Sequence, residues 1–141
     1  MADLVRLWEQ PAATELYMLA GWNQWADAGN ISSGLPQYLI EKSDAKKIGE
    51  LNVGSSYLFQ LPGTHHFLRP EIKLHEGYRE RLTRPVNDIY YTESNGKGLV
   101  IFLGHEPHVD VDRYAEAFMS VVKRLGVKRV VALGGVYGPM P

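Results

Sequence analysis

The chain has 141 residues, of which 45% are hydrophobic and 22% are charged, and it carries a net charge of −1 and no cysteine. This composition is typical of one globular domain and excludes disordered chains, disulfides and thiolate chemistry. No basic stretch points to nucleic acid, no apolar run approaches the ~20 residues of a membrane span, and the N-terminus does not resemble a signal peptide. We therefore expect a single cytoplasmic domain over residues 1–141, with neither a nucleic-acid nor a membrane partner.

The first fifty residues predict a strand, a helix and a second strand. The apolar run at residues 15–21 is typical of a buried strand, and the polar stretch at 22–30 predicts a loop. Residues 46–52 predict the second strand. The helix lies between them, over residues 31–42.

The start of this helix is predicted from its proline. If Ser32 or Ser33 is the cap, Pro36 falls in the first turn, where its missing N–H costs little. Apolar residues recur at helical spacing and predict the buried face. That face carries Ile31, Leu35, Leu39 and Ile40.

The middle of the chain predicts two hairpins. Residues 67–85 alternate apolar and polar side chains around a turn at His75–Glu76–Gly77. Residues 87–104 predict a second hairpin, for which Asn95–Gly96 is the turn signal. The first hairpin mixes arginine and lysine with glutamate. Such a mixture is typical of a solvated face, with a ligand cradle as the less favoured alternative.

The last third predicts a strand–helix–strand unit. Residues 99–104 and 128–135 are apolar runs typical of buried strands, which should be parallel with a right-handed crossover. The helix between them should begin after Asp110 and end at Gly126. Its apolar stripe consists of Tyr114, Ala117, Phe118, Val121, Val122 and Leu125.

These elements indicate an α/β fold with a mixed sheet and helices packed on it. Two helices are few for a sheet that needs both faces covered. We therefore expect that a further helical portion, or a partner subunit, covers the bare face.

Three loops at the carboxyl ends of strands are the candidate sites, because ligands of α/β sheets gather there. In the first loop, Trp22, Asn23, Trp25, Asp27 and Asn30 would form either an aromatic-walled pocket or a structural and interface element in which Asp27 or Asn30 caps the helix. We favour the second interpretation, with Trp22 buried and Trp25 in contact with a partner chain.

The other two loops carry weaker signals. His105, Glu106 and His108 are a metal-ligand set, but Pro107 prevents helical spacing, so we favour a turn with solvent-facing histidines and predict no metal. Gly134 and Gly135 would let a backbone approach a phosphate, although no helix follows them. We find no catalytic set of residues and predict no cofactor.

The combined order of these segments resembles the proteasome assembly chaperone two family. "AGWNQWADAGNISSGLPQYLIEK" is similar to its opening "GWxDAGxAASGALxYL", and "GLVIFLGHEPHVDVDRYAEAFMSVVKRLGVKRVVALGG" is similar to its "LLLGxEPxxxWxxFxxxVxxxAxxxGVxxVVxLGG". The resemblance covers nearly the whole chain. It departs at "NQWA", where the opening loop carries extra residues.

The resemblance implies a three-layer α/β/α sandwich of the phosphorylase/hydrolase-like type. It also implies that the chain is the N-terminal portion of a protein about twice as long. It further implies a non-catalytic, homo-oligomeric or assembly-chaperone role, with proteasome subunits or other proteins as partners. The alternative is a small-molecule protein, either a nucleoside binder or a hydrolase- or phosphorylase-like enzyme, which rests on fold likeness alone.

Overall fold

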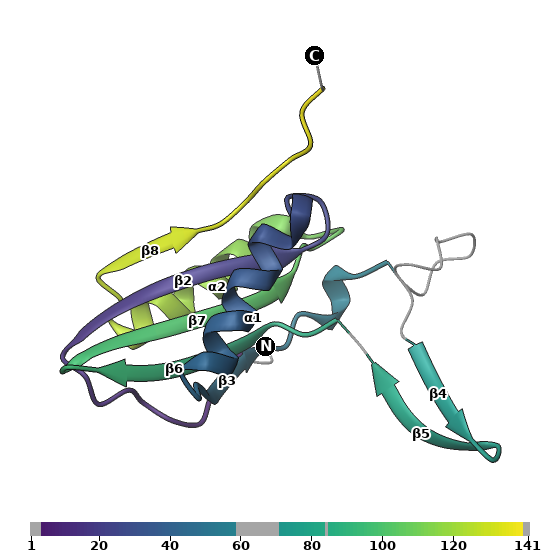
Figure 1. Cartoon of the computed structure of the whole chain (residues 1–141), viewed down its shortest axis with the longest axis horizontal. Helices are drawn as coiled ribbons and strands as arrows, with labels where there is room; N and C mark the ends of the chain where they lie inside the picture. Colours follow the sequence, from purple (N-terminus) through teal and green to yellow (C-terminus); the bar gives the residue numbers. More distant parts are fainter. Residues whose placement is uncertain (1–3, 59–70, 84, 140–141) are drawn as a thin grey trace.

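The two longest strands, β2 (Glu15–Asn23) and β7 (Lys97–His105), run parallel as neighbours within a six-stranded mixed sheet (Figure 1). The structure, a computed structural model, describes residues 4–58, 71–83 and 85–139. The strand order is β1-β3-β6-β7-β2-β8. The other four strands are β1 (Val5–Leu7), β3 (Lys46–Leu51), β6 (Asp88–Ser94) and β8 (Arg129–Ala132).

The sheet combines two parallel pairings with three antiparallel pairings. Strands β7 and β8 both pair parallel with β2, which lies between them, so the predicted parallel strand–helix–strand unit is confirmed. Strands β6, β3 and β1 extend the other side by successive antiparallel pairings. The predicted mixed α/β fold is therefore observed.

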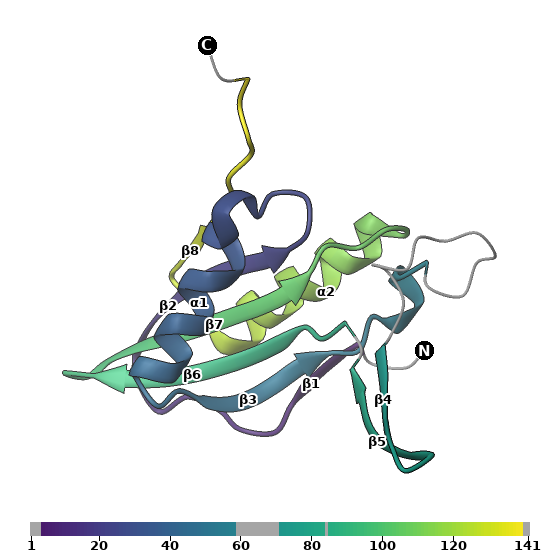
Figure 2. The ribbon, with the colours of Figure 1, turned by 45° about the vertical axis from the view of Figure 1, so that its right-hand side comes forward.

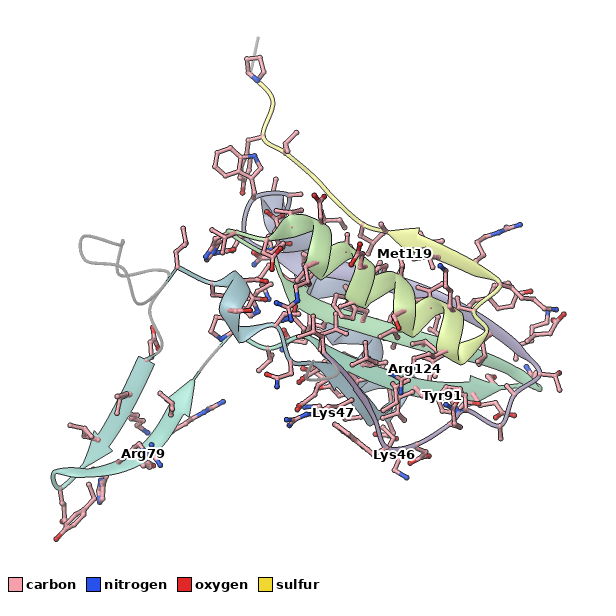
Figure 3. The ribbon with its side chains drawn as sticks, turned by 180° about the vertical axis from the view of Figure 1, so that it is seen from behind. Lys46, Lys47, Arg79, Tyr91, Met119 and Arg124 are labelled. Carbon is pink, nitrogen blue, oxygen red and sulfur yellow. The ribbon has the colours of Figure 1, made fainter. Side chains whose placement is uncertain are left out.

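The two helices lie on opposite faces of the sheet, as the views from front and back show (Figures 1 and 3). They are α1 (Ile31–Lys42) and α2 (Val111–Leu125), and two short 3₁₀ turns occupy Ala28–Asn30 and Gly54–Ser56. Among the described residues, neither helix is long and apolar enough to cross a membrane.

The main core lies between the sheet and α2. The predicted stripe of α2 is confirmed, because all six of its side chains are buried or packed against the core. Strand side chains alternate, so every second residue of β2 and β7 points to this core. Burying each larger apolar side chain contributes about 1.5–3 kcal/mol. The strand residues of this core include Leu16, Met18, Ala20, Ile48, Ile89, Val100 and Phe102.

Helix α1 buries a face different from the predicted one. Its buried residues are Ser32, Ser33 and Pro36. Of the predicted face, Ile31 and Leu35 are exposed, and Leu39 and Ile40 are half-buried. The prediction of the apolar face was wrong because the helix approaches the sheet too closely for large side chains.

Gly21 of β2 touches the backbone of α1 directly. A Cβ atom at this position would lie 1.8 Å from the carbonyl oxygen of Ser32 and 2.7 Å from Pro36 Cγ. Pro36 has no N–H for this carbonyl, which an ordinary residue four positions on would bond. The helix starts at Ile31, so Pro36 lies in its interior rather than in its first turn, and the predicted serine caps were wrong.

The predicted turns are confirmed in backbone geometry. Asn95 and Gly96 have φ of 52° and 75°, as a two-residue type I′ hairpin turn requires. Gly126 ends α2 with φ of 69°, and its N–H and that of Val127 reach back to carbonyls of the last turn. Asp110 stands at the start of α2, but its side chain makes no capping hydrogen bond.

Three boundaries differ from the sequence-based expectation. Strand β2 continues through Trp22 and Asn23, which were expected in the loop, because both residues pair with β7. Strand β8 ends at Ala132 and leaves Gly134 and Gly135 outside it. Strand β1 was not predicted, since its three residues carry too short a pattern.

The remaining hairpin stands apart from the sheet (Figure 2). It consists of β4 (Glu71–His75) and β5 (Tyr78–Thr83), as predicted for this part of the chain. The remainder of the hairpin predicted at 67–85 includes residues outside those described.

We predict that Gly21→Ala destabilises the protein by about 3 kcal/mol, because the new methyl group meets backbone that cannot move aside cheaply. Urea unfolding measures the loss. The matched control is Gly34→Ala in α1, where a Cβ meets only Asn30 Cβ at 3.6 Å. Since alanine favours helix, the control should gain about 0.5–1 kcal/mol. Equal stability of Gly21→Ala and the native protein would refute the close contact.

Candidate functional site

The loops after β2, β7 and β8 meet at one edge of the sheet, as predicted from parallel neighbours. The N–H of Ala28 donates to Gly135 O at 3.0 Å, and the N–H of Gly135 donates to Ala26 O at 2.8 Å. Glu106, in the loop after β7, connects this second loop to the first, because its Oε1 accepts from the N–H of Ala26 at 2.9 Å. These hydrogen bonds therefore connect the three loops into one layer at the carboxyl ends of the strands.

The side chain of Trp22 is held by contacts with aromatic rings and by a hydrogen bond from its indole N–H. Its ring lies 5.5 Å from those of Phe102 and Phe118, and its Nε1 donates to Tyr114 Oη at 2.9 Å. An indole N–H needs such a partner when it leaves water. Trp22 is partly buried against the core, whereas Trp25 is 86% exposed. The two tryptophans thus have different roles, one in packing and one on the surface.

A buried network centred on Asn87 continues from Trp22. Asn87 is 2% exposed, and its Oδ1 accepts from Tyr114 Oη at 2.7 Å and from the N–H of His105 at 3.1 Å. Its Nδ2 donates to Tyr57 Oη at 2.7 Å, and that hydroxyl donates to His105 O at 3.1 Å. Four segments of the chain are joined by this one amide.

Burial keeps both hydroxyl groups of this network protonated. It raises the pKa of Tyr114 and of Tyr57 above the ordinary tyrosine value, although bonds from Trp22 and Asn87 oppose the shift. Each hydroxyl therefore donates one bond and accepts another. Such a fully paired network specifies a unique arrangement of the loops.

Asp27 caps helix α1, as one of the two interpretations predicted. Its Oδ1 accepts from the N–H of Ser33 at 2.8 Å and its Oδ2 from Ser33 Oγ at 2.6 Å. Asn30 occupies the N-cap position with φ of 56°, but its side chain makes no capping bond. Asn23 contributes its backbone carbonyl, which accepts from the N–H of Glu106 at 3.3 Å.

The two histidines of the second loop point to separate partners. His105 Nδ1 lies 3.1 Å from Val86 O. His108 Nδ1 accepts from the N–H of Leu58 at 3.2 Å, so its Nε2 carries the proton and donates to Gln24 Oε1 at 3.0 Å. Within the described residues, no group of three or more histidine, aspartate or glutamate side chains is arranged to hold a metal.

Of the two glycines of the third loop, Gly135 is packed closely and Gly134 has room for a side-chain carbon. A Cβ on Gly135 would lie 2.9 Å from Ile31 Cγ2, and one on Gly134 would lie 3.5 Å from Ala26 Cβ. Gly135 also pairs with Asp27 as an isolated parallel bridge. Tyr137 then reaches back, and its hydroxyl accepts from the N–H of Gly29 at 3.1 Å.

An open pocket of about 260 Å³ lies between α2 and the first loop. Its walls are mostly apolar, and they include the carboxylate of Glu106 and the hydroxyl of Tyr114. Pockets of this kind at strand ends are the usual place for ligands. The lining consists of Trp22, Ala26, Ser32, Glu106, Pro107, Val111, Tyr114, Ala115, Phe118 and Leu133.

Sequence reasoning missed the residues that hold this edge together. Tyr114 was expected only as part of an apolar stripe, and Tyr57 and Asn87 carried no role. An asparagine before a strand usually indicates a turn. Only the fold reveals that Asn87 is enclosed by Tyr57 and Tyr114.

We predict that Asn87→Leu costs about 3 kcal/mol or more, because it leaves two hydroxyls and the N–H of His105 without their buried partner. Chemical denaturation measures the change. Asn52→Leu, at an exposed position, is the control and should stay within about 0.5 kcal/mol of the native protein. Similar losses in both variants would contradict the role of the network.

We also predict that His108 makes the protein less stable in acid. Burial and the charge of His105 lower the pKa of His108, against a smaller opposing effect of Glu106. The unfolded chain therefore binds more protons than the folded one just below the ordinary value of 6.5, and stability falls as the pH drops through that range. His108→Gln should reduce this fall, measured as unfolding free energy between about pH 7.5 and about pH 5. Identical pH dependence in both proteins would rule the effect out.

Comparisons with known proteins identify the family of this fold. The sequence pattern of the PAC2 family matches residues 22–140. The crystal structure of a PAC2 family protein from Streptomyces avermitilis has a TM-score of 0.76 and 26% identity, over 90% of this chain and 52% of that one. A proteasome-assembly chaperone homologue from Mycobacterium tuberculosis has a TM-score of 0.78 and 24% identity, over 89% and 51%.

A protein of unknown function from Corynebacterium glutamicum shares the fold with a TM-score of 0.75 and 18% identity, over 98% of this chain and 51% of that one. The chain thus spans about half the length of these three structures. A comparison with curated proteins finds no match. Because the family pattern extends over most of the sequence and the shared fold agrees with it, the chain belongs to the PAC2 family.

Proposed function

We propose that this protein is a non-catalytic assembly factor that holds another protein at the edge where the three loops meet. Its contact area there is the strand-end surface, defined as Trp25, Ile31, Val136 and Tyr137. The observation that carries the proposal is the exposure of these side chains, which is 86% for Trp25, 85% for Tyr137, 71% for Val136 and 47% for Ile31. Large exposed apolar groups that gather in one place mark interaction sites.

The polar groups of this edge support the same interpretation. Asp27 uses both carboxylate oxygens on Ser33, and His108 uses both ring nitrogens on Leu58 and Gln24. These groups are thus committed to holding the loops in place. A rigid scaffold that presents aromatic side chains suits protein recognition, in which tryptophan and tyrosine dominate the binding energy.

Tyr137 has a fixed position on this surface despite its exposure. Its hydroxyl is bonded to the N–H of Gly29, in the loop that also carries Trp25. The bond reduces the number of conformations that binding must suppress, which favours affinity. Four side chains are too few for a whole interface, which usually buries ~1,200 Å² or more, so the strand-end surface would be its centre.

One similar structure supports the choice of a first partner to test. A similar structure is that of a proteasome-assembly chaperone homologue. We therefore propose proteasome α subunits as the first partners to test, taken from the organism that encodes this chain.

The test is a binding measurement between this protein and those purified subunits. We predict that Trp25→Ala and Tyr137→Ala each weaken binding by about tenfold to a hundredfold, as expected for central aromatic residues. Tyr38→Ala is the matched control, because Tyr38 is a 55% exposed aromatic residue on α1 outside the strand-end surface. All three variants should keep the native melting temperature.

Two results would overturn the proposal. Native protein that binds none of the subunits removes the proteasome as partner, and undiminished binding in both variants removes the strand-end surface. A rise in melting temperature with nucleosides or phosphate would instead favour the alternative, small-molecule binding in the pocket beside Glu106.

A further inference from the structure

The side chain of Glu106 is half-buried and lines the pocket between α2 and the first loop. Its Oε1 accepts from the N–H of Ala26 at 2.9 Å and so holds two loops together. Among the described residues, its Oε2 takes part in no further hydrogen bond or ion pair. One oxygen of this carboxylate therefore has a structural role, and the other is available to a bound molecule.

The electrostatic environment of the pocket is negative. Within the part of the chain that the structure describes, no lysine or arginine lines this pocket. Burial is the main cause that raises the pKa of Tyr114, and the negative charge of Glu106 adds to it, so this charge acts on the pocket wall. An anion such as phosphate would be repelled here, whereas a cation would be attracted.

The other walls of the pocket offer aromatic and aliphatic surface. The rings of Trp22 and Phe118, whose centroids lie 5.5 Å apart, both line it. The side chains of Val111 and Leu133 add aliphatic surface. Apolar area that a ligand removes from water here contributes roughly 25 cal/mol per Å² to binding, before the entropic cost of association. The pocket is therefore suited to a ligand that is mostly apolar.

The two hydroxyl groups of the pocket wall have already donated their protons. Ser32 Oγ donates to Leu133 O at 2.8 Å and accepts from the N–H of Trp22 at 2.8 Å. Tyr114 Oη donates to Asn87 Oδ1 at 2.7 Å and accepts from Trp22 Nε1 at 2.9 Å. Each hydroxyl has only one proton, so neither can donate to a ligand. The strongest polar contact open to a ligand is therefore to accepting oxygen on Glu106.

The volume of the pocket limits the size of the ligand. At about 260 Å³ it is smaller than the ~300–1,000 Å³ of pockets for drug-sized molecules. A water molecule occupies about 30 Å³ of liquid, so the pocket has room for roughly nine groups of that size. This room corresponds to one aromatic ring or one branched aliphatic chain with a short polar end.

We propose that this pocket binds a small apolar amine, in which a protonated primary amino group is attached to one aromatic ring or branched aliphatic chain. The ammonium group donates to Glu106 Oε2, and the apolar group packs against Trp22 and Phe118. A neutral molecule of the same shape would cover the carboxylate without pairing its charge, which costs free energy. The site goes beyond the proposed protein contact, because no residue of the strand-end surface lines the pocket, and the two proposals can fail separately.

The first test titrates the intact chain at neutral pH and follows binding by calorimetry. Phenethylamine, phenethyl alcohol and phenylacetate carry the same ring with a positive, a neutral and a negative group, and isopentylamine is the branched aliphatic amine. We expect a dissociation constant of about 1 mM or lower for at least one amine, binding at least about tenfold weaker for the alcohol, and none for phenylacetate. Failure of both amines to bind at about 10 mM, or equal binding of amine and alcohol, would overturn the proposal.

The second test changes the pocket. Glu106→Gln keeps an oxygen for the N–H of Ala26 but removes the charge, so it should weaken amine binding by about tenfold or more and leave binding of the alcohol no weaker. Ala115→Leu, at an exposed position of α2 on the pocket wall, should weaken both by filling the space. Glu116→Gln, on α2 outside this pocket, is the matched control and should bind as the native protein does. Circular dichroism checks that each variant is folded. Undiminished amine binding in either pocket variant would refute the site.

Discussion

The approach of α1 to Gly21 is the contact on which the candidate site depends. Because the helix backbone lies against β2, Ser32 is within reach of two other elements. Its Oγ accepts from the N–H of Trp22 at 2.8 Å and donates to Leu133 O at 2.8 Å. A larger residue at Gly21 would move α1, and the links from Ser32 to β2 and to the segment after β8 would be lost together.

Local patterns in the sequence predicted the elements whose structure is determined by residues close together in the chain. The apolar runs of β2, β7 and β8, the stripe of α2 and the turn at Asn95–Gly96 were all found, since each is specified by neighbouring residues. The buried face of α1 was predicted wrongly. A helix face made of small residues is buried when a neighbouring backbone packs closely against it. The spacing of apolar residues in the sequence does not predict such a close contact.

The candidate site was predicted only in outline. Parallel strands implied that the three loops meet, and the capping role of Asp27 followed from residue type. The network around Asn87 could not be predicted, because it joins residues from 57 to 114 that are distant in the chain. The network becomes visible only in the fold, where the amide of Asn87 is enclosed by two tyrosines, and no sequence motif indicates it.

The position of β2 between β7 and β8 also has a consequence for the order of folding. Its two neighbours come much later in the chain, since Glu15 pairs with Lys97 and Tyr17 with Arg129. During synthesis, both edges of this apolar strand stay unpaired until most of the chain has emerged. Long-range parallel pairings of this kind slow folding and expose unpaired edges to aggregation. The nascent chain is thus most in need of protection before β7 and β8 close around β2.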